Sequence, residues 1–306
     1  MAKYDLKDIN PMLDTWMIDF LGVKPMTEEE ALYVKAVSRM SLIQAVARAR
    51  NPGCNADTVV ILEGHQGTGK SSAIKALFGE DYFGDQLPPM SSKDASIYIE
   101  GKWCIELAEL EYKRKAEIET IKAFITRTHE NYRPTYGQHL VKHARTNIFF
   151  GTSNATEYLV DETGNRRFLP VSTNEIDLIG LTRSRDQLWA AAALAYDAKE
   201  PYWLVDEVAM IAAKQASDRL EQDPWVEIVL DKLGHLSEVS IKEAYETCFS
   251  PNDTEGLTQM KARRMSKVLV LANWEKDGKF NIGNRRNQVR FVNQNALQEY
   301  KETFEF

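Results

Sequence analysis

The chain has 306 residues, of which 43% are hydrophobic and 27% charged, and its formal net charge is −7. These values are typical of a globular protein with one large domain or about two to three small ones, and they exclude a disordered or fibrous chain. The acidic total excludes a protein that coats nucleic acid through its overall charge, although local basic patches have to be sought separately.

Cysteine spacing and hydropathy indicate the compartment. Cys54, Cys104 and Cys248 lie far apart and show neither zinc-ligand spacing nor a disulfide framework, so we expect reduced thiols. The N-terminal residues lack the apolar core of a signal peptide, and no apolar run reaches the roughly 18 residues that a membrane span needs. We therefore expect a cytoplasmic protein with no membrane partner.

Amphipathic helices are predicted at the start of the chain. Apolar residues recur at intervals of three and four between Met12 and Arg50. Thr27 precedes three glutamates and is the expected N-cap of the second helix, which Asn51-Pro52-Gly53 should end. We assign residues 1–50 to an N-terminal helical region.

A glycine-rich loop follows, between a β-branched apolar run at 58–63 and a helical pattern at 71–78. It reads Gly64-His65-Gln66-Gly67-Thr68-Gly69-Lys70-Ser71, followed by Ser72. In a loop of this spacing the backbone N–H groups point at phosphates, the lysine reaches the β and γ phosphates, and the hydroxyl of Ser71 ligates magnesium. We predict that residues 64–72 bind ATP with Mg²⁺; the alternative is a chance match to the pattern.

Carboxylates follow the next predicted strand, 103–107. A P-loop ATPase needs a carboxylate at the end of a neighbouring strand to hold the metal and polarise the attacking water. The candidates are Glu106 inside the strand, Glu109 just past it, and Glu111. We expect Glu109 to be the catalytic base and Glu106 to share the metal with it and Ser71. The alternative is that these carboxylates are solvated charges.

Polar residues also accompany the third and fourth strands, 146–151 and 167–171. Asn154 follows the third strand and can bond the attacking water or the γ phosphate, unless it is only a turn residue. Arg166 and Arg167 precede the fourth strand, where an arginine can stabilise transition-state charge, also in a neighbouring subunit. Surface charge is the alternative for both arginines.

The fold expected for residues 51–205 is an α/β layered domain with a mainly parallel sheet, because helical segments such as 113–128 separate the strands. A long helix at 184–198 closes this unit. Residues 206–306 have a different order of predicted elements. Short helices at 224–233, 240–248 and 258–273 precede a basic alternating stretch at 281–292, which is the order of a winged-helix module. Its basic residues suit phosphate contacts or form a solvated face; they are Lys261, Arg263, Arg264, Lys267, Arg285, Arg286 and Arg290. Val268, Leu269, Leu271 and Trp274 are expected in its core.

Several motifs, taken in order, closely resemble the virulence-associated protein E (VirE) family. They are Leu62–Ser71, Trp103–Leu110, Tyr132–Gly137 and Gly164–Pro170, with Arg50–Cys54 as a further match. The resemblance covers about Leu13 to Leu204. This family resembles the superfamily 3 helicases of phage, plasmid and viral replication. The resemblance implies an AAA+ core, a ring that is a hexamer, and ATP-driven movement on single-stranded DNA inside a bacterial host cell.

The resemblance also implies roles for residues. Lys70 and Ser71 act in the loop, Glu109 with Glu106 at the acidic strand, Asn154 as sensor, and Arg166 or Arg167 as arginine finger. The chain departs from the family pattern in having Ala108 before Glu109 in place of a second carboxylate. In superfamily 3 helicases a hairpin before the sensor projects into the ring channel. Here residues 133–145 occupy that place, and the expected DNA-binding residues, unless this is an ordinary surface hairpin, are Arg133, Tyr136, Lys142, His143 and Arg145.

Three functions are compatible with these patterns. The first is an ATP-dependent DNA helicase or translocase of phage or mobile-element replication. The second is a regulatory P-loop ATPase that binds DNA without unwinding it. The third is a small-molecule kinase, which the sensor, the paired arginines and the basic C-terminal module disfavour. Many family members carry a primase-type region that this sequence lacks, so we expect a helicase-only protein or a fragment, with a primase or other replication proteins as partners.

Overall fold

The structure is a computed structural model that describes residues 10–113, 115–133, 139–159, 164–220, 223–249, 256–282 and 285–294. The chain divides into two compact units, Met1–Glu221 and Gln222–Phe306. The sequence placed a boundary after residue 205, but helix α8 (Asp206–Ser217) packs with the first unit because Ile211 and Ala212 lie in its core.

A five-stranded parallel sheet forms the centre of the first unit. Its order is β2-β3-β6-β1-β7, and the strands are β1 (Val59–Glu63), β2 (Phe83–Gly84), β3 (Cys104–Leu107), β6 (Ile148–Ser153) and β7 (Phe168–Ser172). Strand β1 lies between β6 and β7, with Val59 opposite both Phe149 and Phe168. The mixed α/β fold with a parallel central sheet that the sequence predicts is therefore confirmed.

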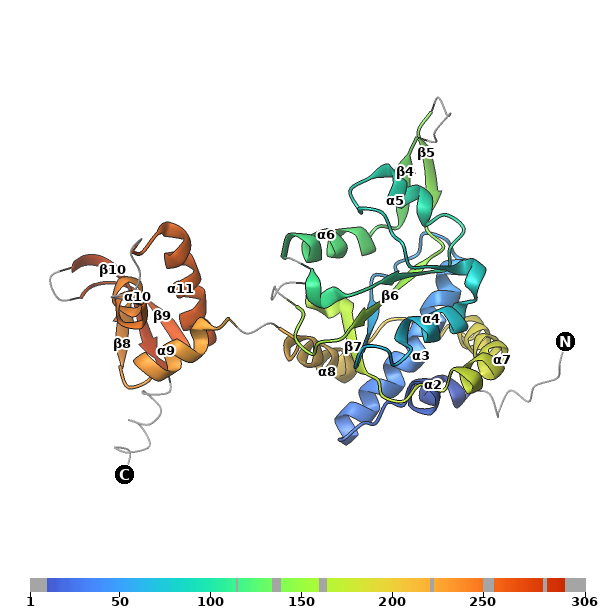
Figure 1. The fold of residues 1–306 in the computed structure, drawn as a ribbon, viewed down its shortest axis with the longest axis horizontal. Helices are drawn as coiled ribbons and strands as arrows, with labels where there is room; N and C mark the ends of the chain where they lie inside the picture. Colours follow the sequence, from blue (N-terminus) through green and yellow to red (C-terminus); the bar gives the residue numbers. More distant parts are fainter. Residues whose placement is uncertain are drawn as a thin grey trace. The chain divides into compact units, whose positions relative to one another are not determined.

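Helices cover both faces of this sheet (Figure 1). On one face lie α2 (Met12–Leu21), α3 (Glu28–Arg50), α4 (Lys70–Phe78) and α7 (Leu178–Asp197); on the other lie α5 (Lys93–Tyr98) and α6 (Lys115–Ile125). Side chains of β1 alternate between the two cores, Val60 and Leu62 in one and Val59 and Ile61 in the other. Because both faces are covered, the strands are continuous apolar runs, which is why they stand out in the sequence.

The predicted start and end of α3 are confirmed. The Oγ1 atom of Thr27 accepts a hydrogen bond from the backbone N–H of Glu30 at 3.1 Å, which caps the helix. The helix ends at Arg50, directly before the Asn51-Pro52 pair. None of the helices in the described part of the chain combines the length and hydropathy needed to span a bilayer.

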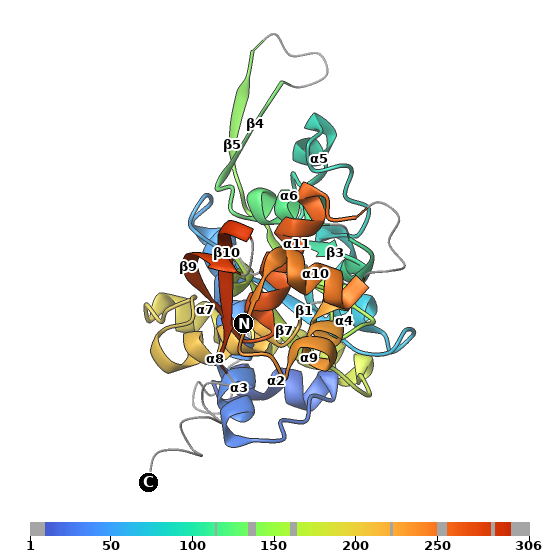
Figure 2. The same ribbon diagram turned by 90° about the vertical axis from the view of Figure 1, so that its left-hand side faces the viewer.

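A two-stranded antiparallel hairpin is inserted between α6 and β6. It consists of β4 (His129–Tyr132) and β5 (Val141–Ala144), with His129 opposite Ala144. Both strands extend away from the body of the first unit in both views (Figures 1 and 2). The paired strands begin earlier than the predicted segment 133–145, because the polar sequence of β4 shows little strand pattern.

The second unit contains three helices and a three-stranded antiparallel sheet. The elements are α9 (Trp225–Leu233), β8 (Glu238–Ser240), α10 (Ile241–Phe249), α11 (Gln259–Leu271), β9 (Trp274–Ile282) and β10 (Arg285–Asn293), with sheet order β8-β10-β9. The three predicted helices and the terminal hairpin are confirmed. Val268, Leu269 and Trp274 are buried as expected, whereas the prediction for Leu271 is wrong because this residue is 46% exposed.

Candidate nucleotide-binding site

The glycine-rich loop joins β1 to α4 at the carboxyl edge of the parallel sheet, where ligands of such sheets bind. Gly64, Gly67 and Gly69 have φ values of 151°, 83° and 92°, which glycine adopts without the steric cost of a Cβ. A Cβ on Gly64 would lie 2.8 Å from the carbonyl oxygen of Thr173. Helix α4 begins at Lys70 without a side-chain cap, so its first N–H groups point from the loop toward an anion-binding position.

The side chain of Lys70 lies inside the loop and is almost fully buried. Its Nζ donates to the carbonyl oxygens of Gly64 at 2.6 Å and His65 at 2.8 Å, and to Oδ1 of Asn154 at 3.1 Å. Burial lowers the pKa of Lys70, and the nearby carboxylates of Glu111 and Glu106 oppose that shift. The loop, the predicted lysine and the predicted sensor asparagine therefore meet at one point.

Two hydroxyl groups converge on one carboxylate oxygen next to this lysine. Ser71 donates to Oε1 of Glu106 at 2.6 Å, and Thr152 donates to the same atom at 2.9 Å. Glu106 is only 3% exposed, and these two hydroxyls satisfy the Oε1 atom of its carboxylate. Thr152 was not predicted, because a threonine inside an apolar strand gives no signal of its own.

Glu109 and Glu111 lie on a tight turn after β3. Glu109 has a φ of 54°, a left-handed conformation that is costly for a residue with a Cβ, and it starts the 3₁₀ turn η2 (Leu110–Tyr112). This turn brings Glu111 to Asn154: its Oε1 accepts from the Asn154 backbone N–H at 3.1 Å and from Nδ2 at 2.7 Å. The second carboxylate oxygen of Glu111 is buried without a hydrogen-bond partner.

A pocket of about 360 Å³ connects these groups. It is lined by Gln66, Gly67, Gly69, Lys70, Ser71, Ser72, Ala108, Glu109, Thr152 and Asn154. His65 and Thr68 contribute to the loop itself, since the Thr68 hydroxyl donates to the carbonyl oxygen of His65 at 3.0 Å. Among the residues that the structure describes, no group of three or more His, Cys, Asp or Glu side chains could hold a metal ion without other ligands.

Arg166 and Arg167 lie at the opposite, amino edge of the sheet. They belong to the 3₁₀ turn η3 (Asn165–Arg167), which directly precedes β7, and they line a separate pocket with Asp57, Thr58 and Trp203. Nε of Arg167 is 3.7 Å from Oδ2 of Asp57, whereas Arg166 is exposed. Strand β1 runs from this edge to the glycine loop over five residues, or roughly 16 Å. The two arginines therefore do not reach the loop of their own chain.

The predicted DNA-binding residues on the hairpin have different surroundings. Arg133, at the end of β4, and Lys142, on β5, are exposed. The ring of His143 stacks on that of Tyr132 with 5.5 Å between centroids, and its Nδ1 lies 3.7 Å from a carboxylate oxygen of Glu100. Tyr136 lies outside the described residues.

Arg145 is a correction to the sequence prediction, because its side chain is buried and has an internal role. Its Nε donates to Oε1 of Glu130 at 2.6 Å, and its Nη1 donates to the carbonyl oxygen of Phe124 at 2.7 Å. The guanidinium group lies 4.4 Å from the ring centroid of Phe124. Burial lowers the pKa of Arg145 to about 10, and Glu130 opposes that shift. Arg145 anchors the base of the hairpin and does not face DNA.

A buried ion pair, which the sequence did not reveal, lies directly behind the glycine loop. Glu63, the residue before Gly64, is 2% exposed. Its two carboxylate oxygens accept from Nε and Nη2 of Arg219 at 2.9 and 3.0 Å, and Oε1 also accepts from the hydroxyl of Tyr158 at 2.8 Å. Arg219 follows α8 and lies far from Glu63 in sequence, so no local pattern indicates the pair.

Three solved structures have some similarity to this chain. The apo structure of the NrS-1 C-terminal region (305–718) is 13% identical with a TM-score of 0.49, and the similarity covers 94% of this chain and 74% of that one. Two A-form apo structures of the NrS-1 C-terminal region are 14% and 16% identical, both with TM-scores of 0.47; they cover 89% and 95% of this chain and 78% of their own.

No curated protein matches the sequence. The profile of the virulence-associated protein E-like domain matches residues 3–221, which end where the first compact unit ends. The motifs around Lys70, Glu109 and Arg166 that resemble this family lie within the matched range. The chain therefore belongs to the virulence-associated protein E-like family.

Proposed function

We propose that this protein is an ATP-dependent DNA helicase or translocase of superfamily 3 type, with an AAA+ core, that serves phage or mobile-element replication in a bacterial cytoplasm. The observation that carries the proposal is the meeting of Lys70, Ser71, Glu106 and Asn154 at one end of β1. These residues come from three separate segments, and each has the chemistry that phosphoryl transfer to water requires.

The residues of the pocket fit a magnesium–triphosphate group. The uncapped N-terminus of α4 and the Lys70 ammonium suit phosphate oxygens, and the Ser71 hydroxyl with the Glu106 carboxylate suits Mg²⁺. Magnesium is usually held by one or two carboxylates together with substrate phosphates, so a cage made only of protein side chains is not needed. When bound, the ion neutralises phosphate charge.

Each side chain then has a distinct task. Lys70 exchanges its bonds to the Gly64 and His65 carbonyls for bonds to phosphate oxygens. Glu109, whose strained turn places it on the pocket wall, orients the attacking water and takes its proton. Asn154 positions that water, and Glu111 holds the amide of Asn154 in a single orientation.

The arginine finger is assigned to a neighbouring subunit. Because Arg166 and Arg167 lie roughly 16 Å from the loop of their own chain, they complete a nucleotide site only in another copy. A head-to-tail contact that repeats and closes forms a ring, and the family resemblance implies six copies. Arg166 is the better candidate, since Asp57 lies beside Arg167.

Measurements of ATP hydrolysis and strand displacement on the full chain test the proposed function. We expect the full chain to hydrolyse ATP, single-stranded DNA to stimulate that hydrolysis, and the protein to displace the strand of a forked duplex only when ATP is hydrolysed. A chain that binds ATP and DNA but displaces no strand would favour the regulatory ATPase, in which the basic helix α11 of the second unit supplies the DNA contacts. ATP turnover that is indifferent to single-stranded DNA would contradict the helicase assignment.

Lys142 provides a test of the hairpin. Lys142→Ala should weaken binding to single-stranded DNA and reduce the slope of log K against log salt by about 0.7, because one phosphate contact is lost. Fluorescence anisotropy with a labelled oligonucleotide at several salt concentrations measures both quantities. Lys35→Ala, an exposed lysine on α3 that lines neither the hairpin nor a pocket, tells whether the change belongs to the hairpin alone. An unchanged salt slope for Lys142→Ala would show that β5 does not contact phosphates.

A further inference from the structure

A second and larger pocket lies at the amino edge of the sheet, away from the glycine loop. It has a volume of about 680 Å³, and its wall includes Trp103 directly before β3, Thr146 shortly before β6, and Tyr82 directly before β2. The glycine loop leaves the other end of β1, so the two pockets open at opposite edges of the same sheet. In the motif Trp103–Leu110, the family resemblance implies roles for Glu106 and Glu109 but none for Trp103.

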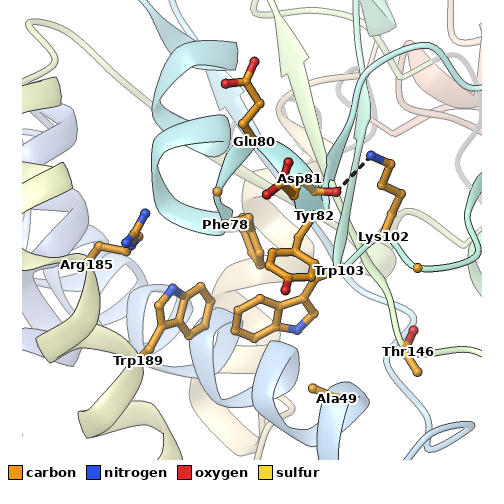
Figure 3. A pocket seen from close by; sticks show the side chains of 12 residues that line it. Ala49, Phe78, Glu80, Asp81, Tyr82, Lys102, Trp103, Thr146, Arg185 and Trp189 are labelled. Carbon is orange, nitrogen blue, oxygen red and sulfur yellow. Dashed lines mark hydrogen bonds between the residues drawn. The ribbon is translucent and has the colours of Figure 1, made fainter.

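Aromatic rings form the floor of this pocket (Figure 3). The rings of Trp103 and Trp189 lie 4.3 Å apart between centroids, and the ring of Phe78 lies 5.3 and 5.2 Å from them. Each indole N–H is already bonded to a backbone carbonyl at 2.8 Å, that of Trp103 to Ala45 and that of Trp189 to Leu77. These bonds fix the rings, so the two tryptophans offer ring surface and no polar atom to a ligand.

The rim adds an exposed ring and charges of both signs. Tyr82 is 56% exposed, and Figure 3 shows it beside Trp103, with Lys102 and Arg185 on opposite sides of the aromatic group. The Glu80 carboxylate is bonded to Lys75 at 2.6 Å, which partly neutralises the acidic part of the rim. A fixed aromatic surface between two cations is the combination that binds single-stranded nucleic acid without reading its sequence.

The pocket adjoins the base of the hairpin. A neighbouring pocket of about 380 Å³ shares Gly101 and Thr146 with it and is lined by Glu100 and His143 as well. His143 lies on β5 next to Lys142, the exposed cation assigned to DNA. One surface therefore leads from β5 to the aromatic floor, and a strand held by the hairpin has a path to this pocket.

We propose that this pocket takes an unpaired base of single-stranded DNA, which stacks on Tyr82 and on the Trp103–Trp189 rings, while Lys102 and Arg185 meet the phosphates on either side. The inference rests on the proposed function for the presence of DNA, but it assigns a site apart from both the glycine loop and the hairpin. A small aromatic metabolite is disfavoured because the polar groups that would fix its orientation lie on the rim, whereas both indole N–H groups of the aromatic floor are already used.

Cross-linking with the full chain tests the site. An oligothymidylate that carries one 5-iodo-deoxyuridine is irradiated with the protein, and the linked peptide is identified by mass spectrometry. We expect links to Tyr82, Trp103 or Trp189.

Tyr82→Ala should weaken oligonucleotide binding about fivefold or more, since one stacking surface is lost, and Tyr82→Phe should restore binding. Tyr112→Ala removes another exposed tyrosine, one on the P-loop side of the sheet, and serves as the matched control.

The outcomes separate this site from the proposed function. Wild-type protein that binds and hydrolyses normally but links only at the hairpin, with binding unchanged by Tyr82→Ala, overturns the pocket and leaves the helicase assignment intact. Wild-type protein that binds no oligonucleotide overturns both. A Tyr82→Ala variant with normal DNA binding and a smaller oligomer on light scattering also overturns the proposal, because the pocket would then accept a second copy of the chain.

Discussion

Lys70→Ala and Arg166→Ala should each abolish ATP turnover alone, and mixing the two variants should restore part of it. Lys70 is the buried cation at the centre of the glycine loop, so its loss should lower kcat at least about 100-fold. Loss of an arginine finger typically lowers kcat about 10³-fold or more. In a mixed assembly, an Arg166→Ala subunit keeps an intact loop and receives Arg166 from a Lys70→Ala neighbour. That interface contains every assigned residue.

The measurement is steady-state ATP hydrolysis over a series of mixing ratios at constant total protein. Activity should pass through a maximum at intermediate ratios, a shape that two independently dead proteins cannot give. Lys75→Ala, on the same helix but exposed and bonded to Glu80, is the matched control and should keep normal turnover. If Arg166→Ala assembles normally and retains full activity, the finger assignment moves to Arg167. If Arg167→Ala is also active, a finger in trans is excluded.

Arg145→Ala should lower the free energy of unfolding of the first unit by about 3 to 5 kcal/mol. The substitution removes the closer of the two guanidinium groups that contact the buried Glu130 carboxylate. It leaves only Nη1 of Arg127, at 3.5 Å, and the Ser96 hydroxyl, and losing the close partner of a buried charge is costly. It also removes the ring contact with Phe124 and the hydrogen bond to its carbonyl oxygen. Urea denaturation followed by circular dichroism measures the change, and the transition of the first unit has to be resolved from that of the second.

Lys142→Ala is the contrasting variant, because Lys142 is exposed on β5, the strand directly before Arg145, and its loss should leave stability unchanged. The double variant Arg145→Leu with Glu130→Leu should recover part of the lost stability, because no unpaired charge stays buried. A stability loss below about 1 kcal/mol for Arg145→Ala, together with weaker DNA binding, would return Arg145 to the DNA-binding residues.

The parts of the site that could be predicted are those that a local pattern marks. The glycine loop lies between a strand and a helix, Glu106 lies on a buried apolar strand, and Asn154 directly follows another. Parallel strands were predictable because a strand covered on both faces is apolar throughout. Their order in the sheet depends on which faces pack together, and no short segment of sequence records that.

The parts that could not be predicted depend on contacts between distant segments. Glu111 meets Asn154 only because Glu109 adopts a positive φ, and neither fact has a signature in the Glu109-Leu110-Glu111 sequence. In the sequence Arg145 cannot be distinguished from the basic residues Lys142 and His143 of β5. Only in the fold does it contact Phe124, to whose carbonyl oxygen it donates a hydrogen bond. Basic residues can be identified in the sequence, but only the fold shows which of them are exposed to a ligand and which are buried.

The Glu63–Arg219 pair limits how this protein can be divided. A fragment that ends at residue 205, where composition suggests a boundary, would lose Arg219 and leave the Glu63 carboxylate buried beside the first residue of the glycine loop. We expect such a fragment to express poorly and to be cut readily by protease, whereas one that ends at Glu221 should resist proteolysis. The last residues of the matched family domain thus help to hold the strand end from which the glycine loop starts.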